Sequence, residues 1–180
     1  MTDSLTVEEC ESLLRGFDDV ADAAVVRTAW RGRDLRIGAV AATGFCDVVG
    51  IRDAVRERCG DGSGLDLLAL VDRIDRDAAG RVAFDDPAGI ERAVLSTASL
   101  ESTETPTEAA LARMWCEALK RDFVGAGDDF LDLGGDSLAI TDLLLRVRQE
   151  WGVPIEYHEF ADVTELRQLA RFLDAARAVA

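Results

Sequence analysis

The sequence holds one histidine and one lysine among 180 residues, and only 6% of its residues are aromatic. It carries 20 basic against 35 acidic side chains, which gives a formal net charge of -15. Binding of nucleic acid requires a basic surface that neutralises phosphates and aromatic rings on which bases can stack. The sequence is poor in both, and we therefore exclude nucleic acid as a ligand.

Long hydrophobic runs are also absent, since no stretch approaches the roughly 20 apolar residues of a membrane-spanning helix. The first residues are acidic, unlike the basic and then apolar pattern of a secretion signal. Four cysteines, Cys10, Cys46, Cys59 and Cys116, show no paired spacing of the C-x-x-C kind. We expect a cytoplasmic protein without membrane contact, whose cysteines are buried or inert thiols rather than disulfides.

His158 is the only histidine, so any serine or cysteine nucleophile with a histidine base would have to use it. Its neighbours, between Ile155 and Phe160, predict a short surface turn. The acidic cluster of residues 128–132 does not fit a calcium loop, because apolar side chains fill positions where oxygen ligands should alternate. We predict no metal site and no catalytic residue in this chain.

A polar segment divides the chain into two parts. Residues 96–105 are rich in Ser, Thr and Glu and predict a flexible linker between a domain of residues 1–95 and a domain of residues 106–180. Residues 1–100 carry 12 basic and 19 acidic side chains, and residues 101–180 carry 8 and 16. The negative charge is therefore a property of both parts.

The first part mixes the periodicities of helices and strands, which predicts a small α+β domain. In chain order we expect a helix (residues 7–14), a β-hairpin (23–30 and 35–42, with its turn at 31–34), a second helix (49–59), a flexible glycine-rich loop (60–64), a buried strand (65–74) and a turn (77–80) before a last strand (81–84).

The second part predicts an all-α domain, a four-helix bundle. Thr105 can cap its first helix, Pro106 fits the first turn, and Glu108 completes a capping box. Another helix is expected from Ser137 to about Trp151.

The bundle closes with a helix that Thr164 caps, after a short turn near Glu159, and Pro154 prevents the preceding helix from continuing. Apolar side chains fall on one face of each long helix. Those expected to point inward are Leu111, Met114, Trp115, Ala118 and Leu119, then Ile140, Leu143, Leu144, Val147 and Trp151, and finally Leu166, Leu169, Ala170 and Leu173.

Leu133-Gly134-Gly135-Asp136-Ser137-Leu138 stands between the first two helices of this domain. One interpretation is a turn made by the glycines, with Asp136 or Ser137 capping the next helix. The other is that Ser137 lies exposed at a helix N-terminus without a histidine base. A serine without a base is a poor nucleophile but can be the substrate of another enzyme.

Residues from about 106 to 173 resemble the carrier, or thiolation, domains of nonribosomal peptide synthetases. The resemblance rests on the stretch 128–138, on the helix after it, and on the Trp-Gly-Val-Pro-Ile segment (151–155) that leads to Phe160. The Gly-Gly-Asp-Ser form resembles the peptide-synthetase branch more than the fatty-acid carriers.

By this resemblance, a phosphopantetheinyl transferase attaches 4′-phosphopantetheine from coenzyme A to Ser137. The arm would then hold an aminoacyl or acyl group as a thioester. The resemblance also places Gly135, Asp136 and Leu138 at the cofactor-binding site, where Leu133, Asp136 and Leu138 would shape recognition, although Asp136 could equally be only a helix cap. A helix N-terminus favours the phosphodiester that joins the arm to the serine.

Residues 8–26 and 70–82 look like parts of the small C-terminal subdomain of adenylating enzymes. In that family a Gly-Lys pair near the end of the subdomain carries the catalytic lysine. The matching position here is Arg81, and residues 1–100 contain no lysine. Arginine keeps the charge but not the compact ammonium group. The large ATP-binding subdomain and a phosphate-binding glycine loop have no counterpart in the sequence, which predicts a catalytically inactive domain that supports folding or docks a partner.

The leading hypothesis is therefore a carrier protein, not an enzyme, in a pathway of secondary metabolite or antibiotic biosynthesis. A separate adenylating enzyme would load it in trans, downstream tailoring or condensation enzymes would use the cargo, and the acidic surface would steer basic partners. A second hypothesis makes the chain the lysine-less half of a split adenylating enzyme fused to a carrier. A third makes it an interaction adaptor whose Ser137 is never modified.

Overall fold

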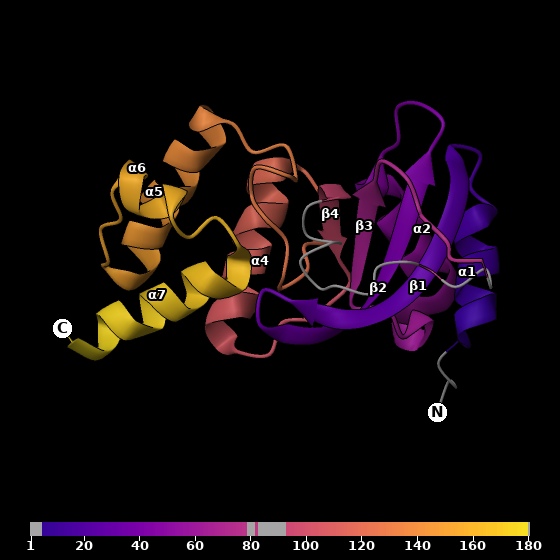
Figure 1. Ribbon diagram of the computed structural model, residues 1–180. Helices are drawn as coiled ribbons and strands as arrows, with labels where there is room; N and C mark the ends of the chain where they lie inside the picture. Colours follow the sequence, from indigo (N-terminus) through magenta and orange to yellow (C-terminus); the bar gives the residue numbers. More distant parts are fainter. Residues whose placement is uncertain (1–4, 79–81, 83–92, 180) are drawn as a thin grey trace. The chain divides into compact units, whose positions relative to one another are not determined.

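The protein is described by a computed structural model that covers residues 5–78, 82 and 93–179. It divides into two compact units, Met1–Leu100 and Glu101–Ala180, whose helices and strands are labelled in Figure 1. Within the described ranges, none of the helices has both the length and the apolar character that crossing a bilayer requires.

The first unit is built on a four-stranded sheet in the order β1-β2-β3-β4. β1 (Val20–Trp30) and β2 (Arg33–Ala42) form an antiparallel hairpin. β3 (Leu67–Val71) runs parallel to β2, and β4 (Val94–Ser99) is antiparallel to β3. This mixed sheet confirms the prediction of a small domain that combines helices and strands.

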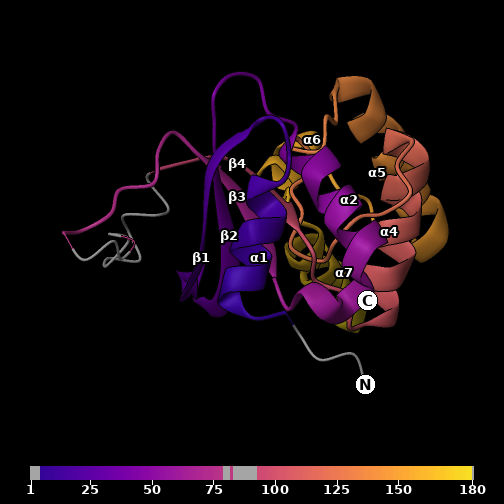
Figure 2. The same cartoon turned by 90° about the vertical axis from the view of Figure 1, so that its right-hand side faces the viewer.

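Two helices cover one face of this sheet (Figure 2): α1 (Val7–Arg15) and α2 (Val48–Cys59). α2 lies in the crossover that a parallel pair such as β2 and β3 requires. Gly38 lets α1 approach the sheet closely, because a Cβ there would stand 3.0 Å from Cδ1 of Leu14. Alternate residues of β2 and β3 form apolar clusters on the opposite face, among them Ile37 and Ala69.

Two predicted loops of this unit are shorter or more ordered than expected. The hairpin turn is only Arg31 and Gly32, with φ of 47° and 78°, and such paired positive values suit the twist of a two-residue hairpin. The prediction of a flexible loop at residues 60–64 is wrong. η1 (Gly60–Ser63) is a 3-10 helix, and the carbonyl of Ser63 accepts a hydrogen bond from the thiol of Cys10.

The strand predicted at residues 65–74 is the shorter β3, and beyond it Arg76 pairs with Val82 in an isolated antiparallel bridge. Most of the predicted turn and last strand, residues 77–84, lies outside the described residues. The same holds for Arg81, the predicted counterpart of the catalytic lysine.

The predicted linker at residues 96–105 is wrong in its first part, because Ser96–Ser99 belong to β4. Small Ser, Thr and Ala side chains resemble a linker in composition, yet Ala98 and Ser99 are buried in the sheet. The N–H of Leu100 donates to the carbonyl of Asp66 in the first unit, and the carbonyl of Glu101 accepts from Ala126 in the second. The chain therefore passes between the units at one peptide bond.

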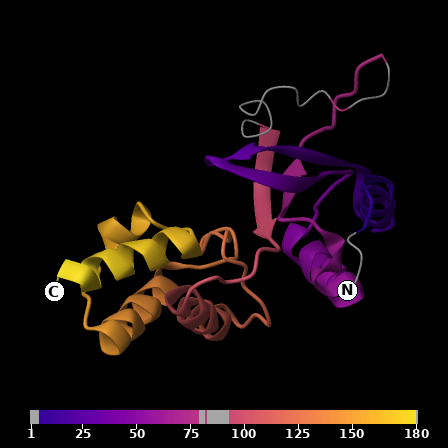
Figure 3. The same ribbon diagram turned by 90° about the horizontal axis from the view of Figure 1, so that it is seen from below.

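The second unit contains three long helices and one short helix among its described residues. α4 (Pro106–Leu119) packs against both α5 (Ser137–Trp151) and α7 (Leu166–Val179), as Figure 3 shows. The short α6 (Tyr157–Ala161) replaces the turn predicted around exposed His158. A capping box at the start of α6, in which the N–H of Glu156 donates to the carboxylate of Glu159 at 2.8 Å, helps to stabilise this five-residue helix.

Three aromatic rings lie at the centre of this unit. Phe130 meets Trp115 edge to face at 4.9 Å between ring centroids and meets Phe160 at 5.7 Å. Most of the predicted inward side chains are buried around them. Those that are only half-buried are Met114, Ala118, Leu119, Leu144 and Trp151.

Two predicted caps have other partners. Thr105 caps α4 as predicted, but the carboxylate of Glu108 does not close a capping box. It accepts from the N–H of Glu104 and pairs with Arg167, which lies 59 residues further along the chain. Thr164 does not cap α7, because the N–H groups of Leu166 and Arg167 donate to the carbonyls of Asp128 and Ala126. The hydroxyl of Thr164 donates to Asp129. Arg167 and Asp129 are distant in sequence from Glu108 and Thr164, and local sequence patterns do not indicate such pairs.

Asp22 joins three segments of the first unit. Its carboxylate accepts hydrogen bonds from Arg15 at the end of α1 (3.3 Å) and from Arg76 beyond β3 (3.2 Å). Partial burial raises the pKa of Asp22, but the hydrogen bonds from Arg15 and Arg76 outweigh it, and the net pKa lies below its ordinary value. The charged form is therefore favoured in the folded protein.

Replacing Asp22→Asn should lower the free energy of unfolding near neutral pH, by up to about 1 kcal/mol because the group is partly exposed. A pKa that is lower in the folded than in the unfolded state stabilises the fold above the unfolded value of about 3.9, and this stabilisation is lost as the pH falls through the folded value. Urea unfolding of both proteins at neutral and acidic pH measures the effect. A difference that persisted after full protonation would contradict it.

Candidate functional site

The segment that leads into α5 is a tight hydrogen-bonded turn. The N–H groups of Gly134 and Gly135 donate to the carbonyls of Leu131 and Phe130, both at 2.9 Å. Gly134 has a φ of +93°, which side chains rarely adopt. A Cβ on Gly135 would stand 2.2 Å from the ring of Phe130. The geometry therefore requires both glycines, and the predicted turn is confirmed.

Ser137 is the first residue of α5 and is exposed to solvent. Asp136 caps the helix, since its carboxylate accepts from the N–H of Ala139 at 2.8 Å. The unpaired N–H groups of a first helical turn carry partial positive charge, which favours an anionic group such as a phosphate. The hydroxyl of Ser137 is therefore exposed to solvent at a position where a phosphate ester would be stabilised.

The other predicted site residues adjoin Ser137 and differ in what they do. Gly135 makes the close approach to Phe130, and Asp136 is the helix cap, so the capping interpretation is correct for Asp136. Leu138 is 77% exposed, which is unusual for a large apolar side chain.

Leu131, on the other side of the Gly-Gly turn, is also exposed, and so is Leu145. Leu138 and Leu145 are seven residues apart on α5 and therefore lie on the same side of that helix. Large apolar side chains that are exposed, such as Leu138 beside Ser137, are candidates for a surface that another protein touches.

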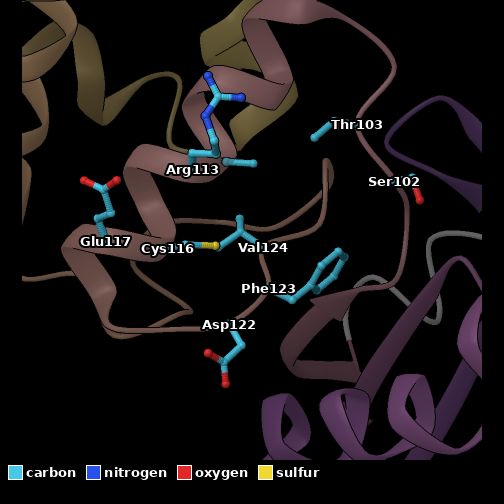
Figure 4. Close-up of a pocket in the computed structure, with 9 residues that line it drawn as sticks. Ser102, Thr103, Arg113, Cys116, Glu117, Asp122, Phe123 and Val124 are labelled. Atoms are coloured by element: carbon cyan, nitrogen blue, oxygen red, sulfur yellow. The ribbon is translucent and has the colours of Figure 1, made fainter.

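Two pockets of the second unit lie away from Ser137. One of them is an open pocket of about 480 Å³. Figure 4 shows its lining side chains, with the sulfur of Cys116 beside Val124. Its other lining residues are Ser102, Thr103, Ala112, Arg113, Glu117, Asp122 and Phe123. Ser137 does not line it. The side chain of Ser137 is exposed to solvent, as suits a group on which another enzyme acts.

Two arginines of this unit make contacts that no pattern in the sequence indicates. The side chain of Arg121 donates to the carbonyl of Leu133, just before the Gly-Gly turn. Arg167 is 3% exposed and pairs with Glu101 and Glu108. Neither contact has a periodic spacing or a motif that could have indicated it.

Residues 109–173 match the family model described as "Phosphopantetheine attachment site". The second unit is a phosphopantetheine carrier domain. Its cofactor is covalently attached 4′-phosphopantetheine, and the exposed hydroxyl of Ser137 at the positive end of α5 fits the phosphate ester of that group.

Relatives of this carrier domain occur in synthetases of much greater length. The AMB antimetabolite synthetase AmbE of Pseudomonas aeruginosa is 32% identical over 111 residues, which are 60% of this chain and 5% of the relative. Tyrocidine synthase 3 of Brevibacillus parabrevis is 27% identical over 167 residues, 92% of this chain and 3% of the relative. That second match extends across both units.

Among solved structures, one titled "Non Ribosomal PCP domain" is 33% identical, with a TM-score of 0.37, and covers 40% of this chain and 92% of its own. The sequence matches to the family model and to the long synthetases make this a carrier domain of the nonribosomal peptide synthetase type.

Proposed function

We propose that the protein carries an aminoacyl or acyl group as a thioester on 4′-phosphopantetheine attached to Ser137. The observation that carries this proposal is the exposed serine at the first position of α5, held by the Gly-Gly turn and the Asp136 cap inside a phosphopantetheine carrier domain. When attached, the arm supplies a thiol and keeps its cargo at high effective concentration near successive enzymes. The domain then works as a four-helix bundle in which short α6 is the third helix.

The residues around Ser137 have separate tasks in this proposal. Asp136 and Gly135 hold the serine at the helix end, while exposed Leu138 and Leu131 offer an apolar surface to a phosphopantetheinyl transferase and later to the loading and downstream enzymes. The net charge of -15 would favour partners with basic surfaces.

For the first unit we propose a supporting or docking role without catalysis, with the cargo activated by a separate adenylating enzyme. Support comes from Arg81 at the position that matches the family's catalytic lysine, and from the lack of lysine in residues 1–100. A guanidinium does not replace the compact, strongly hydrated ammonium group at such a position.

The test is the intact mass of the apo-protein after incubation with a broad-specificity phosphopantetheinyl transferase, magnesium and coenzyme A. One phosphopantetheine should be added to the wild type and none to Ser137→Ala, because the ester requires the hydroxyl. Ser102 is the other serine of the second unit, and Ser102→Ala should be modified like the wild type. No addition to the folded wild type would overturn the proposal and leave an unmodified adaptor.

A further inference from the structure

We propose that Arg121 is a positioning residue for attachment of phosphopantetheine, because it holds the turn before Ser137 in the shape that the transferase accepts. This inference rests on the function proposed above. The guanidinium of Arg121 donates two hydrogen bonds to the carbonyl of Leu133, from Nε at 3.1 Å and from Nη2 at 3.0 Å. Hydrogen bonds from a charged donor are stronger than those between neutral groups.

Arg121 is itself held firmly by the end of α4. Lys120 lies in the left-handed region with a φ of +54°, and its N–H donates to the carbonyl of Cys116. The N–H of Arg121 donates to the same carbonyl at 2.9 Å. Such paired bonds close the end of a helix and fix the residues that follow. The guanidinium therefore reaches the turn from a rigid base.

Leu133 is the point at which this support matters most. Its side chain is 2% exposed, and its carbonyl directly precedes Gly134 and Gly135. Glycine has the greatest backbone freedom of all residues, so a Gly-Gly pair moves readily unless its flanks are held. Asp136 holds the far flank by capping α5, and Arg121 holds the near flank.

Loss of the Arg121 side chain would release the Leu133 carbonyl and allow the two glycines more conformations. The transferase would then have to order the turn when it binds, and ordering of a loop weakens binding. The chemistry at the serine hydroxyl would be unchanged once the turn is ordered. The effect should therefore fall on KM and not on kcat.

The experiment measures the kinetics of coenzyme A-dependent modification for the wild type, Arg121→Ala and Arg121→Lys. Arg171→Ala is the matched control, because Arg171 is exposed on α7 and its loss removes the same charge. We expect KM to rise about tenfold in Arg121→Ala, as for loss of hydrogen bonds to a charged group. kcat should stay near the wild-type value. The KM of Arg121→Lys should lie between those of the wild type and Arg121→Ala, because lysine keeps the charge but cannot donate two hydrogen bonds in the planar geometry of a guanidinium.

Hydrogen exchange provides the second measurement. The amides of Gly134 and Gly135 should exchange faster in Arg121→Ala, while those of Leu143 and Val147 in the middle of α5 should not change. Faster exchange at all four would indicate general destabilisation and would overturn the positioning role. An unchanged KM in Arg121→Ala would overturn it as well, with attachment to Ser137 intact. A wild type that is not modified would instead refute the proposed function.

Discussion

Replacing Arg167→Met is expected to lower the free energy of unfolding of the carrier domain by about 3–5 kcal/mol. The guanidinium is buried and lies 3.1 Å from Glu101 and 3.3 Å from Glu108. Both of those carboxylates are largely withdrawn from solvent. Removing the guanidinium leaves the carboxylates of Glu101 and Glu108 buried without a cation. A buried charge without a partner lowers the free energy of unfolding by more than the intact ion pair raises it.

Glu104 supplies the matched control. Its side chain is 74% exposed and its carboxylate lies 3.8 Å from Arg167, so Glu104→Gln should cost no more than about 1 kcal/mol. Replacing Glu108→Leu together with Arg167→Met should recover part of the loss, because it removes one of the two buried negative charges and leaves only that of Glu101. Urea unfolding combined with hydrogen exchange at α4 and α7 reports on the carrier domain separately from the first unit. Wild-type stability in Arg167→Met would contradict the prediction.

Replacing Gly135→Ala should destabilise the carrier domain by about 1–3 kcal/mol through overpacking. The new Cβ would stand 2.2 Å and 2.4 Å from ring atoms of Phe130 and 2.6 Å from its carbonyl oxygen. The ring has little room to retreat, because it packs edge to face between Trp115 and Phe160. The turn must shift instead, and Ser137 with it, so modification by the transferase should slow strongly in the same variant.

Gly152→Ala separates this steric effect from backbone strain. Gly152 has a φ of +70° at the far end of α5, and a Cβ there would meet nothing within 4 Å. Its replacement should cost about 1–2 kcal/mol for the left-handed conformation and leave the rate of modification unchanged. Thermal unfolding and the mass assay measure both quantities in both variants. If Gly135→Ala were modified as fast as the wild type, the close approach to Phe130 would have no role in presenting the serine.

Local features of the sequence predicted much of the carrier domain and its site. Thr105 and Asp136 cap their helices as expected, because a cap involves only the next few residues. The Gly-Gly turn and Ser137 could be predicted for the same reason, since the whole motif is contiguous. Similarly, the hairpin and α2 follow from short-range periodicity.

Contacts between distant residues were decided only by the tertiary structure. The second half of β4, Ser96–Ser99, has the small side chains of a linker and is a strand because β3 pairs with it, which its composition did not indicate. Glu108 was expected to cap its own helix, but a cation 59 residues away binds its carboxylate. Arg121 reaches Leu133 across the whole loop between α4 and α5. The sequence by itself determined the local elements and the exposed serine at the start of α5, whereas burial and charge pairing between remote segments determined how that serine is held.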